Sequence, residues 1–127
     1  MPLLSWENKY SVNNNQLDGH HKTLFDIFNR LYDICMIPDN AHRVDQIIDE
    51  LISYTNYHFS AEQQYMRDIG YMDIYSHILL HQGFKQKIIY LKQVGNNNVP
   101  RATRELIAFL GKWLLNHVVT EDNKYSI

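Results

Sequence analysis

The spacing of the apolar residues limits most strongly how this chain can fold. Apolar side chains recur at helical spacing over four stretches, at about residues 20–37, 40–69, 73–94 and 100–119. The breaks between these stretches are short and rich in helix-ending residues, namely Pro38, Gly70 and the sequence "GNNNVP" at 95–100. The pattern predicts an all-α protein, an up-down-up-down antiparallel four-helix bundle.

Residues 1–19 precede the first apolar stripe and are predicted to form a non-helical N-terminal arm. Trp6 and Tyr10 in this arm are expected to pack on the bundle. The 127 residues are enough to bury one hydrophobic core, so a single domain over 1–127 is predicted.

The composition and net charge argue against some classes of binding partner. The formal net charge is −2 and no basic stripe is present, which argues against a nucleic-acid partner. No apolar run approaches the length of about 18 residues that a membrane span needs. The N-terminus "MPLLSWENKYSV" lacks the features of a signal peptide, so we expect a cytoplasmic protein. The single cysteine excludes an intrachain disulfide.

Histidines occupy the apolar stripes in an unusual number. Five of the seven histidines lie there: His21, His58, His77, His81 and His117. One such histidine would ordinarily be a hydrogen-bonded core residue, but burying five imidazoles together is costly unless every ring nitrogen finds a partner. In an antiparallel bundle all five fall at the same end of the core. A shared metal cation would give each of them a partner.

Two carboxylates accompany these histidines. Glu62 follows His58 by four residues, so both face the same side of one helix. After His117 the spacing leaves two candidates open. Glu121, at i+4, fits helix geometry, whereas Asp122, at i+5, is about 140° round an ideal helix and faces the site only if the helix loosens there.

The donor set indicates which metal would suit it. Five imidazoles and two carboxylates exceed the four ligands that zinc prefers, but they suit two six-coordinate ions bridged by carboxylates, and iron fits best. The zinc-protease pattern is absent, because "HILLH" has no glutamate after its first histidine. The Glu-x-x-His pairs of oxygen-activating di-iron bundles are absent too. A histidine-rich site favours ferrous iron and therefore reversible O₂ binding.

Several motifs resemble the hemerythrin family, and within it the small bacteriohemerythrins. They are "SWENKYSV", "LDGHHKTLF", "HFSAEQQYM", "GYMDIYSHILLH" and "WLLNHVVTEDNKY", and they span nearly the whole chain. The resemblance implies a non-haem di-iron site whose ligands are His21, His58, Glu62, His77, His81, His117 and Asp122.

The resemblance also implies a role for each ligand. Three histidines would hold one iron (His77, His81 and His117), and two would hold the other (His21 and His58), which keeps a position open for O₂. Glu62 and Asp122 would bridge the irons together with an oxo or hydroxo group. By the same resemblance, the O₂ pocket would be lined by Leu24, Phe59, Trp113, Leu114 and Val118.

The chain departs from the family pattern at a few positions. His20 stands where glutamine is usual, and we expect it to lie at the surface or behind the ligands. Gln63 stands where a second glutamate is usual, and "GYM" replaces Gly-Tyr-Pro. His42 is expected to face solvent, far from the site.

The resulting functional hypothesis is reversible O₂ binding, for storage or for delivery to oxygen-consuming enzymes, by a protein that is not itself an enzyme. The alternatives are a sensor of O₂, redox state or NO that acts through a separate partner, and a di-iron enzyme that reduces peroxide or NO. We expect a monomer.

Overall fold

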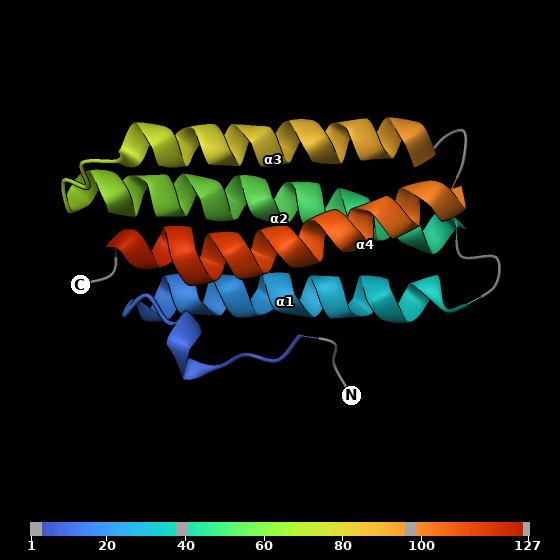
Figure 1. Ribbon diagram of the computed structural model, residues 1–127, viewed down its shortest axis with the longest axis horizontal. Coiled ribbons are helices and arrows are strands. Elements are labelled where there is room, and N and C mark those ends of the chain that lie inside the picture. Colours follow the sequence, from blue (N-terminus) through green and yellow to red (C-terminus); the bar gives the residue numbers. More distant parts are fainter. Residues whose placement is uncertain (1–3, 38–40, 96–98, 126–127) are drawn as a thin grey trace.

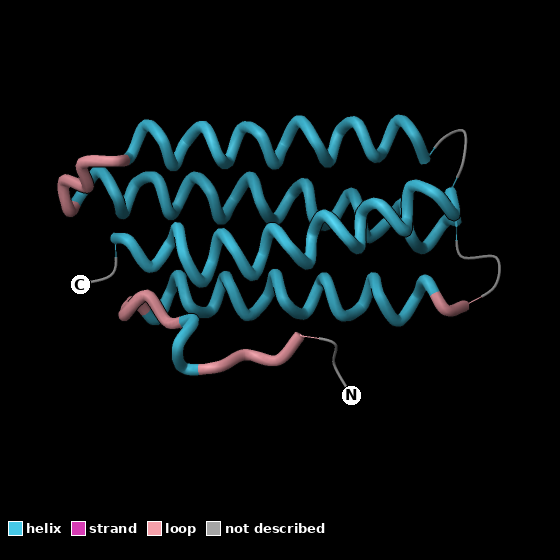
Figure 2. Tube along the Cα trace, viewed as in Figure 1, coloured by secondary structure: helices cyan, strands magenta, loops and turns pink. Residues whose placement is uncertain are grey.

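The computed structural model describes residues 4–37, 41–95 and 99–125, and these form a bundle of four long helices (Figure 1). The helices are α1 (Asn15–Cys35), α2 (Ala41–Asp68), α3 (Ile74–Gly95) and α4 (Val99–Asn116). Consecutive helices run antiparallel, α1 packs against α2 and α4, and α3 packs against the same two. No strand occurs among the residues described (Figure 2), so the predicted all-α antiparallel bundle is confirmed.

The N-terminal arm is shorter than predicted. Helix α1 begins at Asn15 rather than near residue 20, because the side chain of Asn14 caps it by accepting a hydrogen bond of 3.0 Å from the backbone N–H of Leu17. The arm also contains a 3₁₀ turn at Asn8–Tyr10. It packs on α1 as expected, since the rings of Trp6 and Tyr10 contact Phe25 with centroid distances of 5.8 and 5.5 Å.

The other helix ends follow local chemistry. Gly70 has a φ of 69°, a left-handed conformation that suits glycine, and the backbone N–H of Tyr71 beyond it bonds the carbonyl of Met66 at 2.9 Å. The chain then turns back into α3. The predicted breaks at Pro38 and within 95–100 fall largely on residues outside the described ranges.

The C-terminal end of the bundle departs from simple helix. Helix α4 ends at Asn116 instead of near residue 119, and a π-helical segment (His117–Glu121) and a 3₁₀ turn (Asp122–Tyr125) follow. This segment lies at the end of the bundle where α1 begins, α2 ends and α3 begins (Figure 1). No helix of the described residues is long and apolar enough to cross a membrane.

Candidate metal centre

Seven polar side chains meet inside the bundle at this end. Each is at most 2% exposed, and they come from all four helical regions: His21, His58, Glu62, His77, His81, His117 and Asp122. The structure therefore brings together every side chain that was predicted as a ligand. Buried polar groups at this density need partners, and the histidines and carboxylates supply only part of them to one another.

Glu62 divides its two carboxylate oxygens between two groups of histidines. Oε1 lies 2.8 Å from Nε2 of both His77 and His81. Oε2 lies 3.3 Å from Nε2 of His58 and 3.4 Å from Nε2 of His21. A carboxylate in this position faces two separate sets of ring nitrogens, one with each oxygen.

The two carboxylate oxygens of Asp122 also face different histidines. Its Oδ1 lies 2.9 Å from Nε2 of both His77 and His117, and its Oδ2 lies 3.0 Å from Nε2 of His21. Despite these short distances, neither Asp122 oxygen finds a partner in hydrogen-bond geometry among the residues that the structure describes, and neither does Nε2 of His117. Buried nitrogen and oxygen atoms that lie this close together without hydrogen bonds are typical of metal ligands.

Two overlapping sets of ligand atoms could each hold a metal ion. One set is Glu62 with His77, His81 and His117, and the other is Glu62 and Asp122 with His21 and His58. Imidazole nitrogen together with carboxylate oxygen suits iron, so the residues present fit the metal expected from the sequence.

The π-helical segment determines whether Glu121 or Asp122 faces the centre, a choice that the sequence spacing left open. The backbone N–H of Asp122 bonds the carbonyl of His117, an i to i+5 hydrogen bond that widens the turn. The wider turn brings Asp122 onto the face of His117. Glu121, the i+4 candidate, instead pairs with Lys124 at 3.1 Å and keeps 24% of its side chain exposed.

Opposite charges lie close together in the centre. Burial opposes ionisation of both carboxyls, but the surrounding histidines prevail and hold the pKa of Glu62 and that of Asp122 well below their usual range. Burial would likewise lower the pKa of His21 and His77, but the two carboxylates raise each to about 9. For His81 burial prevails and lowers the pKa to about 4. The imidazolium ions of His21 and His77 therefore offset the charge of the two buried carboxylates.

Tyr125 is a contributor that the sequence analysis missed. Its buried hydroxyl donates a hydrogen bond of 2.9 Å to Oε2 of Glu62. Burial and the nearby carboxylates raise the pKa of this phenol, so it stays a neutral donor. The available signal was its position three residues after Asp122, which places both on one side of a helical turn.

Two side chains contact the outer nitrogens of ligand histidines. Gln63 lies 2.9 Å from Nδ1 of His81, and Nδ1 of His20 lies 3.0 Å from Nδ1 of His58. His20 is only 7% exposed, so it lies behind the ligands and not at the surface. His42 is exposed, as expected.

Apolar side chains surround the centre. Phe59 stacks on His81 with ring centroids 3.9 Å apart, and Trp113 stacks on His117 at 4.2 Å. Trp113 is partly buried, and the other predicted pocket residues are fully buried in the same core cluster: Leu24, Phe59, Leu114 and Val118. That they line an O₂ pocket stays a prediction.

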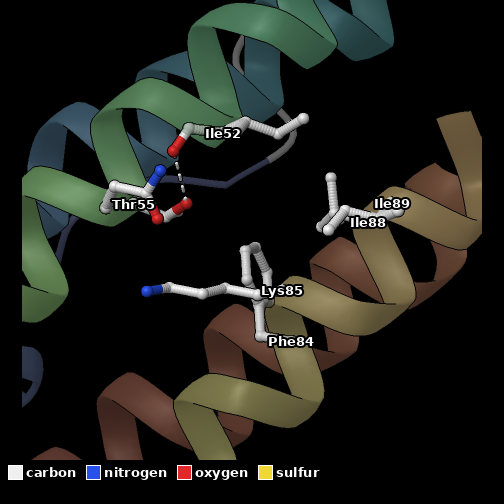
Figure 3. Close-up of a pocket in the computed structure, with 7 residues that line it drawn as sticks. Ile52, Thr55, Phe84, Lys85, Ile88 and Ile89 are labelled. Atoms are coloured by element: carbon white, nitrogen blue, oxygen red, sulfur yellow. Dashed lines mark hydrogen bonds between the residues drawn. The ribbon is translucent and has the colours of Figure 1, made fainter.

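A groove between α2 and α3 lies farther along the bundle (Figure 3). Ile52 and Thr55 of α2 face Phe84, Lys85 and Ile88 of α3 across it. The ring of Phe84 also contacts Trp113 at 4.3 Å and Phe59 at 5.6 Å. Phe84 thus lies between the groove and the aromatic rings that cover the centre.

Comparison with known proteins agrees with this site. Residues 12–126 match the model of the hemerythrin HHE cation-binding domain. A bacteriohemerythrin of Clostridium acetobutylicum is 27% identical, over 97% of this chain and 98% of its own length. A hemerythrin-like protein of Naegleria gruberi is 31% identical, over 96% of this chain and 90% of its own length.

Solved structures show the same likeness. A crystal structure of wild-type hemerythrin superposes with a TM-score of 0.84 at 27% identity, covering 98% of this chain and 95% of that one. The family model covers nearly the whole chain, and the likeness in fold is equally extensive. This chain belongs to the hemerythrin family.

Proposed function

We propose that this protein binds O₂ reversibly at a non-haem di-iron centre, for storage or for delivery to oxygen-consuming enzymes. The proposed ligands are His21, His58, Glu62, His77, His81, His117 and Asp122. Membership of the hemerythrin family and the buried cluster of histidines and carboxylates support this proposal.

The observation that carries the proposal is the division of the Glu62 oxygens. Oε1 is 2.8 Å from two histidines on α3, and Oε2 is 3.3 and 3.4 Å from His58 and His21. Two ions held here would share Glu62, and Asp122 would serve both as well; by family resemblance an oxo or hydroxo group would complete the centre. The α3 histidines and His117 would hold one ion, and His21 and His58 the other, which keeps a position open for O₂.

Iron, when bound, supplies the affinity for O₂ and the electrons that reversible binding requires. The chain itself holds the ions and excludes water. Its ligands are at most 2% exposed, and aromatic rings stack directly on His81 and His117. A dry, apolar enclosure slows the loss of electrons from the centre to solvent.

An optical titration tests the function. The iron-loaded protein is reduced without oxygen, O₂ is added, the visible spectrum is recorded, and the O₂ is removed. We expect a visible absorption band that appears with O₂ and disappears on its removal. Immediate and lasting conversion to the diferric form would contradict the proposal and favour a redox sensor or a reductase.

A pair of alanine variants tests the ligand assignment. His77→Ala removes a ring nitrogen that lies within 2.9 Å of both carboxylates, so we expect loss of iron and of the reversible spectrum. His42→Ala, at an exposed position, is the matched control and should keep both. A normal oxygenated spectrum from His77→Ala would refute the assignment.

A further inference from the structure

His20 is buried beside the proposed centre without being one of its ligands. It precedes His21 on α1, and adjacent helical residues point about 100° apart. The ring of His21 therefore faces the carboxylates, while the ring of His20 faces α2. There its Nδ1 lies 3.0 Å from Nδ1 of His58, and the two rings are nearly perpendicular, at 89°.

The opposite side of the His58 ring faces the centre, because its Nε2 lies 3.3 Å from Oε2 of Glu62. A histidine that binds a metal through Nε2 must carry its proton on Nδ1. That N–H is buried, so it needs an acceptor. His20 supplies the nitrogen at hydrogen-bond distance.

We propose that His20 is a positioning residue of this centre. Its Nδ1 accepts the Nδ1–H of His58 and fixes the tautomer that leaves Nε2 of His58 free for the metal. This inference rests on the proposed di-iron site and adds a residue that supports it from outside. Acceptors of this kind orient the ligand ring and make it a better donor to the metal.

The surroundings of His20 hold its ring in place. Tyr57 packs on it at a centroid distance of 5.0 Å, and Tyr54 contacts it edge-on at 6.0 Å. The ring is thus fixed by neighbours on α2, the helix that carries His58. One turn of α1 thereby provides a ligand, His21, and the acceptor for a second ligand.

The two histidine groups differ in this outer support. Within the described part of the chain, Nδ1 of His21 has no hydrogen-bond partner, whereas Nδ1 of His58 has His20 beside it. In the group of three, Gln63 contacts Nδ1 of His81. Loss of the His20 acceptor would leave both rings of the two-histidine group unsupported, so the metal at that half should be lost first.

Three variants test the proposal. His20→Leu removes the acceptor, His20→Gln keeps one as an amide carbonyl, and His42→Leu makes the same change at an exposed position. Co²⁺ is titrated into each metal-free protein and followed by its visible absorption, and retained iron is counted after a chelator challenge. Circular dichroism checks that each variant is folded.

We expect His20→Leu to bind the more weakly held of the two metals about 10–100-fold less tightly and to retain about one iron. His20→Gln and His42→Leu should match the unmodified protein within a few-fold. The proposal is overturned if His20→Leu binds both metals normally, or if His20→Gln is as defective as His20→Leu. If the unmodified protein itself binds fewer than two metals, the di-iron site fails, and the inference fails with it.

A measurement on the unmodified protein keeps the proposal testable if His20→Leu does not fold. In the Zn²⁺-loaded protein, ¹⁵N-resolved NMR of the histidine rings reports which nitrogen carries the proton. We expect His58 to be protonated at Nδ1, with that proton protected from exchange and coupled to Nδ1 of His20. A proton on Nε2 of His58 would overturn the proposal.

Discussion

Loading the centre with metal should release at least about two protons per chain at pH 7, from His21 and His77. In the metal-free protein the pKa of His21 and that of His77 are raised to about 9, so at pH 7 about 99% of each ring is protonated. Each must lose its proton before the Nε2 lone pair can bind a cation. Glu62 and Asp122 are ionised beforehand, because the histidines keep the pKa of both carboxyls low.

The release makes metal affinity depend steeply on pH. With two protons displaced, the apparent affinity near pH 7 changes about 100-fold per pH unit, or about 2.7 kcal/mol. At pH 9, His21 and His77 are each about half protonated, so their combined release falls from about two protons to about one. The pKa of His117 is raised as well, by the nearby carboxylate of Asp122 against the effect of burial, and it adds to the release in the same direction.

Calorimetry measures the number of protons released when the metal binds. Anaerobic Fe²⁺ is titrated into the metal-free protein at pH 7 and at pH 9, each in two buffers with different ionisation enthalpies. The dependence of the observed heat on buffer enthalpy gives the protons released. A proton lost from a water that bridges the irons would add to the proton release at both pH values. The difference between the release at pH 7 and at pH 9 is therefore what tests the prediction. Equal proton release at pH 7 and pH 9 would refute the reasoning.

Three further results are expected. The stability that His21 and His77 contribute to the metal-free protein should be complete below pH 6.5 and be lost as pH rises through about 9, because both have folded-state pKa values above the unfolded value; thermal unfolding that does not change between pH 6.5 and pH 9 would contradict it. Tyr125→Phe removes the donor to Oε2 of Glu62 and should destabilise the metal-free protein by about 1.5–3 kcal/mol in denaturant titrations, and a change below about 0.5 kcal/mol would exclude a role for that bond. Gln63→Glu places a carboxylate beside Nδ1 of His81 and should make that ring a stronger electron donor to the iron. The reduction potential of the iron centre should then fall, and autoxidation should become faster. An unchanged reduction potential would show that this contact has no electronic role.

The helix count and the location of the histidines were readable from the sequence. His77 and His81 are one turn apart, and the same holds for His58 and Glu62, so each pair shares a face whatever the rest of the fold does. Antiparallel order then places all of them at one end of the bundle. These are consequences of periodicity and short connections, which a single sequence expresses directly.

The start of α1 was harder to read because its first residues resemble a loop. The run Asn13–Asn15 is typical of turns, yet Asn14 caps the helix and Asn13 adopts a positive φ of 59° just before it. Asp18 then accepts hydrogen bonds from Ser11 and from the backbone N–H of Val12, at 2.6 and 2.9 Å. Such contacts depend on how the arm folds back, which propensity alone does not specify.

The choice between Glu121 and Asp122 shows the limit of periodicity most clearly. A regular α-helix would turn the residue at i+5 from His117 away from the core. The chain shifts to an i to i+5 hydrogen bond at this point, and Asp122 gains short contacts to three histidines. The π turn is a rare helical geometry, and here it places a second buried carboxylate among the imidazoles. Two of those three histidines, His21 on α1 and His77 on α3, lie far from Asp122 in the sequence, so the local sequence after His117 cannot reveal the wider turn.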